Sequence, residues 1–298
     1  GRNHFSAGEA TPAGASFVTA RGWDDLSAMI KLYEAQGLAV DELLVEQYVQ
    51  NGDIAKRFAM YYDLFTKYRS DYQIDLILEG TADTGLAERA RRAPFDERVA
   101  VMGLIVDATV GRLRQAVLEE KAAAFTHGVL ADLKARLAAA DVAENGNGAD
   151  LMRATATALA HDRDTERAAS LLTEERYRSF ERAIGLLDEV LRTGAERPEG
   201  PTFNLLRERF NARLDALDGS IDDAAAALDN VFRFVEEAFG EGQEMLMLVT
   251  DLSVNRAGMA FINDHGCERY FAHNQNLQFY ERGSDLAARI DRITLEEE

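Results

Sequence analysis

The stretch SFVTARGWDDLSAMIKLYE, residues 16–34, decides how the first part of this chain folds. Its apolar side chains recur at spacings of three and four residues and therefore share one face of a helix: Trp23, Leu26, Ile30 and Tyr33. Thr19 is a suitable N-terminal cap, and Gly37, just beyond the stretch, is a suitable C-terminal one. The stretch therefore predicts an amphipathic helix.

Arg21 lies in the first turn of this predicted helix. The helix dipole is positive there, which disfavours a cation unless an anion is also bound. A phosphate group is a suitable anion, because the forked guanidinium matches its oxygens. The simpler interpretation is a surface arginine whose stem covers Trp23, and physical chemistry alone favours it.

Similar periodicity continues along the chain, and no strand-like alternation bounded by hairpin turns occurs. Only 4 prolines are present, and abundant Ala, Leu, Glu and Arg favour helix. We therefore expect an all-α fold of about ten to twelve helices. The longer predicted helices cover residues 41–50, 53–79, 95–125, 129–142, 150–170, 174–193, 202–217 and 220–239.

Glycine-containing pairs predict the breaks between several of these helices. His127-Gly128 is expected to end one long helix. Asp218-Gly219 is expected to turn the chain before a helix that Ser220 and Asp223 cap. The segment ENGNGAD, residues 144–150, is the clearest predicted loop. The apolar segments that follow residue 243 predict short, buried helices.

An aromatic stripe lies on the predicted helix 53–79: Phe58, Tyr61, Tyr62, Phe65, Tyr68 and Tyr72. Such a stripe could stack bases or bind a ligand. More commonly it forms a core between helices, with the tyrosine hydroxyls reaching water, and we expect that role here.

The chain is strongly acidic, with 52 Asp and Glu against 33 Lys and Arg and a net charge of -19. Such a surface repels phosphate backbones, so we expect no nucleic-acid partner. No apolar run is long enough to cross a bilayer, so no membrane span is expected. The single cysteine, Cys267, excludes an intramolecular disulfide and suits a cytoplasmic protein.

The first fifteen residues are small and polar, without the apolar core of a signal peptide, and predict a flexible lead-in over residues 1–15. The chain begins with Gly1 instead of methionine, as an excised fragment of a longer protein would.

Thr19-Ala20-Arg21, continued by Gly22-Trp23, resembles the small-residue-x-Arg turn that opens the helical lid subdomain of MoxR-type AAA+ ATPases. The sequences ARGWDDLS and QYVQNGDIAKRFAMYYDLFTKYRSDY resemble a bacterial branch of that family. The resemblance covers residues 16–78, about a fifth of the chain. The later stretch FGEGQEMLMLVTDLSVNRAGMAFINDHGC is also similar to that branch.

The resemblance implies that Arg21 is a sensor-type residue that contacts the nucleotide phosphates in the intact ATPase. It implies ATP and Mg²⁺ as cofactors of the intact protein, a hexameric ring with a chaperone-like role, and a von Willebrand factor A domain protein as a partner. Residues 16–79 would be the AAA+ lid-like subdomain and residues 80–298 a helical extension for interaction. The ATPase core with its phosphate loop is absent from these residues, so this chain alone is expected to be inactive and to hold no cofactor.

His161-Asp162 invites comparison with the all-α HD phosphohydrolases, with His127 as a further metal ligand. Such a site needs several His and Asp ligands on one metal. The chain has 5 histidines, and the surrounding AHDRDTERA is charged like a solvated helix end. We therefore expect no metal there.

The remaining candidate sites have simpler interpretations. His265, Cys267 and His273 could bind zinc, but a structural zinc site needs four ligands. A nucleophilic Cys267 would need a nearby base and a lowered pKa. Residues 239–243 are glycine-rich but follow a helix and lack a lysine, so they predict a helix end and a turn. The acidic tail, residues 295–298, is expected to be solvated.

Three functions therefore stay open at the level of sequence. The leading one is a C-terminal fragment of a MoxR-like ATPase, whose lid couples ATP hydrolysis to remodelling of a partner. The alternative is a freestanding helical scaffold or adaptor. The third is an HD-type metal phosphohydrolase.

Overall fold

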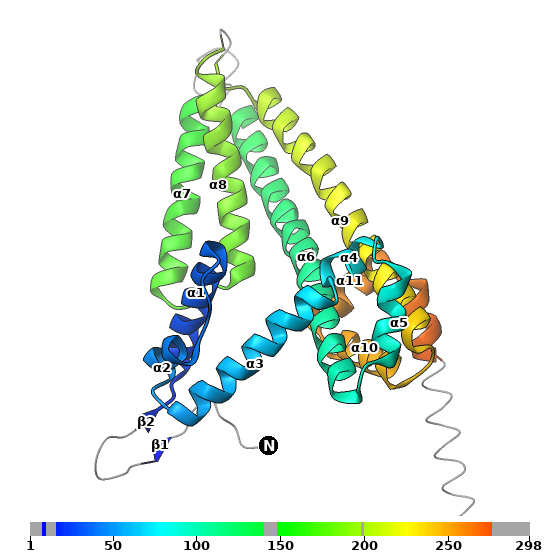
Figure 1. Ribbon diagram of the computed structural model, residues 1–298. Coiled ribbons are helices and arrows are strands. Elements are labelled where there is room, and N and C mark those ends of the chain that lie inside the picture. Colours follow the sequence, from blue (N-terminus) through cyan, green and yellow to red (C-terminus); the bar gives the residue numbers. More distant parts are fainter. Residues whose placement is uncertain (1–7, 10–15, 140–147, 198–199, 276–298) are drawn as a thin grey trace, which may run out of the picture. The chain divides into compact units, whose positions relative to one another are not determined.

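The computed structural model describes residues 8–9, 16–139, 148–197 and 200–275 (Figure 1). Within these ranges the fold is all-α, as predicted. The helices are α1 (Ala20–Gln36), α2 (Glu42–Val49), α3 (Gly52–Asp71), α4 (Ile74–Glu79), α5 (Thr84–Arg92), α6 (Phe95–Ala139), α7 (Gly148–Ala168), α8 (Glu174–Gly194), α9 (Phe203–Phe239), α10 (Gln243–Val254) and α11 (Arg256–His265). Residues 268–275 are also helical.

Extended structure is limited, in the described ranges, to one short antiparallel pair. Strand β1 (Gly8–Glu9) pairs with β2 (Ser16–Phe17). The rest of the expected lead-in lies outside the described residues, as do most of the predicted loop at 144–150 and the acidic tail.

The chain folds into two compact units. The first unit comprises residues 1–74 and 92–104, and the second comprises residues 75–91 and 105–298. The hydroxyl of Tyr72 donates a hydrogen bond of 2.6 Å to Glu97, which joins the two pieces of the first unit. The first boundary between the two units, at residues 74 and 75, lies close to the domain boundary expected after residue 79. Nothing in the sequence predicted that residues 92–104 rejoin the first unit.

In the first unit α1, α2 and α3 surround a small apolar core. The Thr19 hydroxyl accepts a hydrogen bond of 3.0 Å from the Gly22 N–H, and Gly37 ends α1 with a φ of 65°. Both predicted caps of α1 are therefore confirmed. The buried members of the core are Val18, Leu26, Val45, Val49 and Ala55.

The predicted helix 53–79 is wrong in one respect, because the chain leaves the helix at Tyr72 and Gln73. Gln73 has a φ of 45°, and α4 starts at the next residue. The two helices consequently belong almost entirely to different units, with only the first residue of α4 in the first.

The aromatic stripe of α3 forms a core only in part. Phe58 packs against Trp23 with a ring separation of 5.2 Å, and Tyr72 is fully buried. The Tyr62 hydroxyl bonds Glu34, and burial together with this hydrogen bond raises the pKa of Tyr62 to about 12. Tyr61, in contrast, is 63% exposed.

The helical period explains this exposed portion. The buried or half-buried aromatic residues of α3 follow one another at spacings of three and four and share one face: Phe58, Tyr62, Phe65, Tyr68 and Tyr72. Met60 and Leu64 point away from that face. With Tyr61 they form an exposed apolar cluster at helical spacings of three and four, which we call the α3 cluster.

In the second unit α6, from residue 105 onward, and α7 to α9 are the long helices. Helices α7 and α8 run side by side as a hairpin (Figure 1). Helix α6 has 45 residues and α9 has 37. The predicted breaks at His127-Gly128 and at Asp218-Gly219 are therefore wrong, and Ser220 lies inside α9 instead of capping a new helix.

Apolar periodicity carries α6 through Gly128. On α6 the buried positions Ala122, Thr126 and Leu130 follow one another at spacings of four across Gly128. A glycine in a helix interior costs only about 1 kcal/mol relative to alanine. Burial of a single large apolar side chain contributes about 1.5–3 kcal/mol. The continuous buried face therefore outweighs the glycine.

The core of this unit lies between α6, α7, α8 and α9. Thr173 and Thr202 cap α8 and α9 through hydroxyls that accept hydrogen bonds of 3.2 Å from the backbone. The buried core residues are Leu130, Leu133, Met152, Ala156, Leu186, Leu187, Val190, Leu205, Leu206 and Phe210.

Within the described residues, no single helix combines the length and the hydropathy needed to cross a bilayer. Helices α10 and α11 meet that criterion only as a pair, and they are bent by 89° at their junction.

A pair of glycine substitutions tests this description. Gly128→Ala should stabilise the chain by about 0.5–1 kcal/mol, because a Cβ meets no atom within 4 Å in the middle of α6. Gly22→Ala should destabilise it by about 1–3 kcal/mol, because its Cβ would lie 2.5 Å from the Tyr48 carbonyl oxygen. Denaturant unfolding measures both effects. A destabilising Gly128→Ala would show that the helix is interrupted there.

Candidate functional site

Arg21 projects from the first turn of α1 into solvent. Its side chain is 90% exposed, and its Nε lies 3.8 Å from Asp25. An exposed pair at this distance contributes little to stability. The guanidinium is therefore available to an anion that approaches from outside the unit.

The backbone around Arg21 is held firmly even though its side chain is not. Gly22 brings α1 against the backbone of α2, since any Cβ there would collide with the Tyr48 carbonyl. The next residue, Trp23, packs on Phe58, and Leu26 is 1% exposed. These contacts orient the first turn of α1. Sequence reasoning placed Arg21 correctly on the helix but missed the role of Gly22 as the site of closest approach between α1 and α2.

The histidines considered as metal ligands do not converge. His161 and Asp162 are exposed on α7, and His127 is exposed on α6 with its ring 6.3 Å from Phe210. Among the described residues, no three or more His, Cys, Asp or Glu side chains form a group that could hold a metal ion. The HD phosphohydrolase alternative therefore gains no ligand set from the structure.

His265 and His273 pair with carboxylates. The Nε2 of His265 lies 3.0 Å from Glu120. His273 is 7% exposed and stacks on Phe232, with Nε2 2.8 Å from Glu236 and Nδ1 3.2 Å from Glu241. The two rings thus contact carboxylates of α6, of α9 and of Glu241, which lies between α9 and α10.

Arg269 completes a C-terminal ion cluster, which consists of Asp229, Glu236, Glu241, Arg269 and His273. Burial acts to raise the pKa of Glu236, but hydrogen bonds from His273 and Arg269 outweigh it and hold that pKa below its ordinary value. The cluster fastens residues 268–275 to α9.

Cys267 lies at the start of this segment. Burial raises the pKa of its thiol above the ordinary value. A thiol with a raised pKa stays protonated at neutral pH, whereas a nucleophile requires the thiolate. The raised pKa therefore gives no support to a nucleophilic role for Cys267.

The glycine-rich residues 239–243 form a helix end and a turn, as predicted. Gly240 ends α9 with a φ of 62°, and Gly242 precedes α10.

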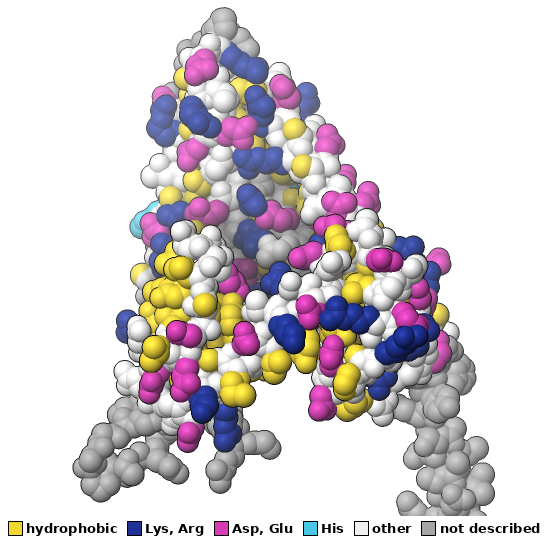
Figure 2. Space-filling model, viewed as in Figure 1, with side chains coloured by type: hydrophobic (Ala, Val, Ile, Leu, Met, Phe, Trp, Pro, Cys, Tyr) yellow, Lys and Arg dark blue, Asp and Glu magenta, His cyan; other side chains and the backbone are white. Residues whose placement is uncertain are grey.

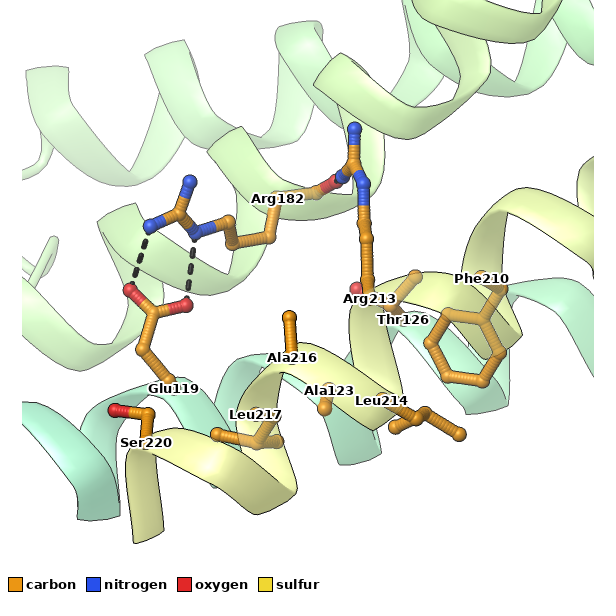
Figure 3. Close-up of a pocket in the computed structure, with 10 residues that line it drawn as sticks. All are labelled: Glu119, Ala123, Thr126, Arg182, Phe210, Arg213, Leu214, Ala216, Leu217 and Ser220. Atoms are coloured by element: carbon orange, nitrogen blue, oxygen red, sulfur yellow. Dashed lines mark hydrogen bonds and ion pairs between the residues drawn. The ribbon is translucent and has the colours of Figure 1, made fainter. Parts of the chain in front are cut away.

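The second unit has a cleft between α6, α8 and α9, with a volume of about 360 Å³ (Figure 3). We call it the α6–α9 cleft. Its lining residues are Glu119, Ala123, Thr126, Arg182, Phe210, Arg213, Leu214, Ala216, Leu217 and Ser220. Arg182 points across it to Glu119 and makes two hydrogen bonds, of 2.8 and 2.7 Å.

Sequence reasoning missed this cleft because it divided α6 and α9 into shorter helices. Glu119, Ala123 and Thr126 stand at spacings of four and three, which was a readable signal that they share a face of α6. Which helix lies opposite that face cannot be read from such spacing.

Comparisons with protein-family models, with curated proteins and with solved structures find no match to this chain.

The C-terminal ion cluster predicts a pH dependence of stability. The pKa of Glu236 is lower in the folded chain, so the unfolded chain binds the proton first as the pH falls. The stabilisation by ionised Glu236 is thus present above the ordinary glutamate pKa of about 4.3 and is lost below it. Glu236→Gln should be less stable than the parent at pH 6, and this difference should shrink towards about pH 3.

Urea unfolding across this pH range measures the effect, and Glu237→Gln is the matched control because Glu237 is exposed beside it. A difference between Glu236→Gln and the parent that does not change with pH would contradict the assignment.

Proposed function

We propose that this chain is the non-catalytic C-terminal part of a MoxR-type AAA+ ATPase, formed by a lid-like subdomain and a helical extension. The proposal rests on the resemblance of residues 16–78 to that family. One structural observation supports it best: Arg21 is almost fully exposed on a helix start whose backbone is immobilised by Thr19, Gly22 and Trp23. A residue that senses bound phosphate needs a backbone in a fixed position and a guanidinium that no other side chain covers.

In this proposal the ATPase core supplies ATP, Mg²⁺ and the phosphate loop, and Arg21 contacts the phosphates from the lid. Rotation of the lid then transmits hydrolysis to the helical extension. The intact protein would act as a hexamer and remodel a client, with a von Willebrand factor A domain protein as a partner.

Exposed apolar side chains of the first unit support a large contact with another protein part. Leu32 is 54% exposed, Leu43 70% and Met60 61%, and hydrophobic side chains gather over α1 in Figure 2. Clusters of exposed apolar side chains commonly mark protein–protein contacts. The ATPase core is the partner that the proposal assigns to this surface.

The same surface is compatible with the alternative function, a freestanding helical scaffold or adaptor. The open reading frame upstream distinguishes the two. About 200 further residues, on the order of one domain, that include a GxxxxGK[ST] phosphate loop would support the ATPase proposal. A start codon just before Asn3 would refute it.

The purified chain, residues 1–298, should hydrolyse no ATP and should bind nucleotide weakly or not at all, because the phosphate loop is outside it. Phosphate release and equilibrium dialysis with labelled ATP measure these properties. Turnover by the chain alone would overturn the proposal.

In the full-length ATPase, Arg21→Ala should lower kcat by about tenfold or more, since a charge-assisted phosphate contact contributes about 1.5–3 kcal/mol. Arg57→Ala, which removes another exposed arginine of the same unit, is the control and should leave kcat unchanged. Equal effects of the two variants on kcat would show that Arg21 is not part of the nucleotide site.

The exposed α3 cluster gives a second prediction about the first unit. Met60→Ser together with Leu64→Ser should change the free energy of unfolding by less than about 0.5 kcal/mol for each substitution, because both side chains are exposed. The double variant should weaken association between this chain and the separately produced ATPase core. Isothermal calorimetry measures that affinity, and unchanged affinity would show that the α3 cluster faces away from the core.

A further inference from the structure

The α6–α9 cleft is built from one face of each long helix. Ala123 and Thr126 of α6 lie on one side, and Leu214 and Leu217 of α9 lie on the other (Figure 3). Phe210 belongs to the buried core and forms part of the floor. The helices α6 and α9 therefore stand apart here and leave an apolar space between them.

Two guanidinium groups and one carboxylate lie at the edge of this apolar space. Arg182 donates to Glu119, and Arg213 donates to Glu189 at 2.7 Å and to the Arg182 carbonyl at 3.1 Å. These hydrogen bonds hold both guanidiniums in place and leave further N–H donors on each.

Charge around the cleft is also unbalanced. Glu189 serves two arginines, since Arg209 lies 3.7 Å from it beside Arg213. Glu119 likewise pairs with both Arg178 and Arg182, so four guanidiniums contact these two carboxylates. The lining itself carries two guanidiniums, Arg182 and Arg213, against one carboxylate, Glu119, which favours an anion at this place.

Size decides what kind of anion fits. The volume of about 360 Å³ lies at the lower end of small-molecule sites, which span roughly 300–1,000 Å³. A helix about 10–12 Å across would place less than roughly one turn in such a volume. The cleft therefore suits a slender ligand better than a helical peptide.

We propose that the α6–α9 cleft binds a small amphiphilic carboxylate. Its aliphatic chain lies against Ala123, Leu214 and Leu217, and its carboxylate accepts hydrogen bonds from Arg213 and Arg182. The apolar lining excludes water from the aliphatic chain of the ligand. Glu189 and Glu119 already position the guanidiniums, which orient the carboxylate of the ligand.

Calorimetric titration of the purified chain tests this site with sodium decanoate, below its micelle-forming concentration, as the probe. Decylammonium has a matched chain with the opposite charge, and butanoate has the same head group with a short chain. Decanoate should bind saturably at one site, and each of the other two probes should bind at least about tenfold more weakly.

Two tryptophan substitutions on α9 locate the binding. Ala216→Trp fills the cleft and should weaken decanoate binding at least about tenfold, whereas Asn211→Trp lies outside the lining and should leave it unchanged. Arg213→Gln should weaken decanoate binding by about tenfold. Circular dichroism confirms that each variant is folded.

Hydrogen–deuterium exchange on the unsubstituted chain locates the bound ligand without any substitution, so misfolding of a variant cannot affect the result. Decanoate should protect residues 119–126 and 210–220. The proposal is overturned by any of four results: no saturable decanoate binding, equal binding of decylammonium, unchanged binding by Ala216→Trp, or protection confined to other segments.

Discussion

The α6–α9 cleft depends on the contacts that α8 makes with both α6 and α9. Towards α6, Phe180 meets Phe125 with a ring separation of 5.4 Å, and Arg182 binds Glu119. Towards α9, Leu186 and Leu187 join the same buried core as Leu205 and Leu206, and Glu189 binds Arg213. Apolar burial supplies most of the stabilisation, and the exposed ion pairs around it contribute less. Basic and acidic side chains alternate over the surface in Figure 2.

The α6–α9 cleft follows from that arrangement. Because α8 bridges its neighbours through long side chains, α6 and α9 need not touch where Arg182 and Arg213 extend between them. Small residues, Ala123 and Ala216, line the space that results. Conformational freedom of the two guanidiniums is already restricted by Glu119 and Glu189, so an anion that binds there would encounter preorganised donors.

The first unit obeys a different constraint, because α3 is apolar on more than its buried face. Phe58 and Tyr72 lie on that buried face, whereas Met60 and Leu64 stay exposed on the opposite one. Arg21 and the α3 cluster are the exposed features on which the proposed contact with another protein part rests.

The sequence by itself determined the helical class, the limits of α1 and the exposed position of Arg21, because capping and the periodicity of three and four act over a few residues. It misplaced the breaks at Gly128 and Gly219. At Gly128 the continuous buried face of α6 overrides the turn-forming pair. Around Gly219 no residue between Phe210 and Ala224 is buried, and α9 continues through exposed and half-buried positions. Only the tertiary structure decided that Tyr61 is exposed, that His273 meets Glu236 and that Arg182 and Arg213 share a cleft. These features depend on which helices become neighbours. Helices far apart in the chain become neighbours when whole faces pack together, and a local sequence pattern does not show which faces will pair.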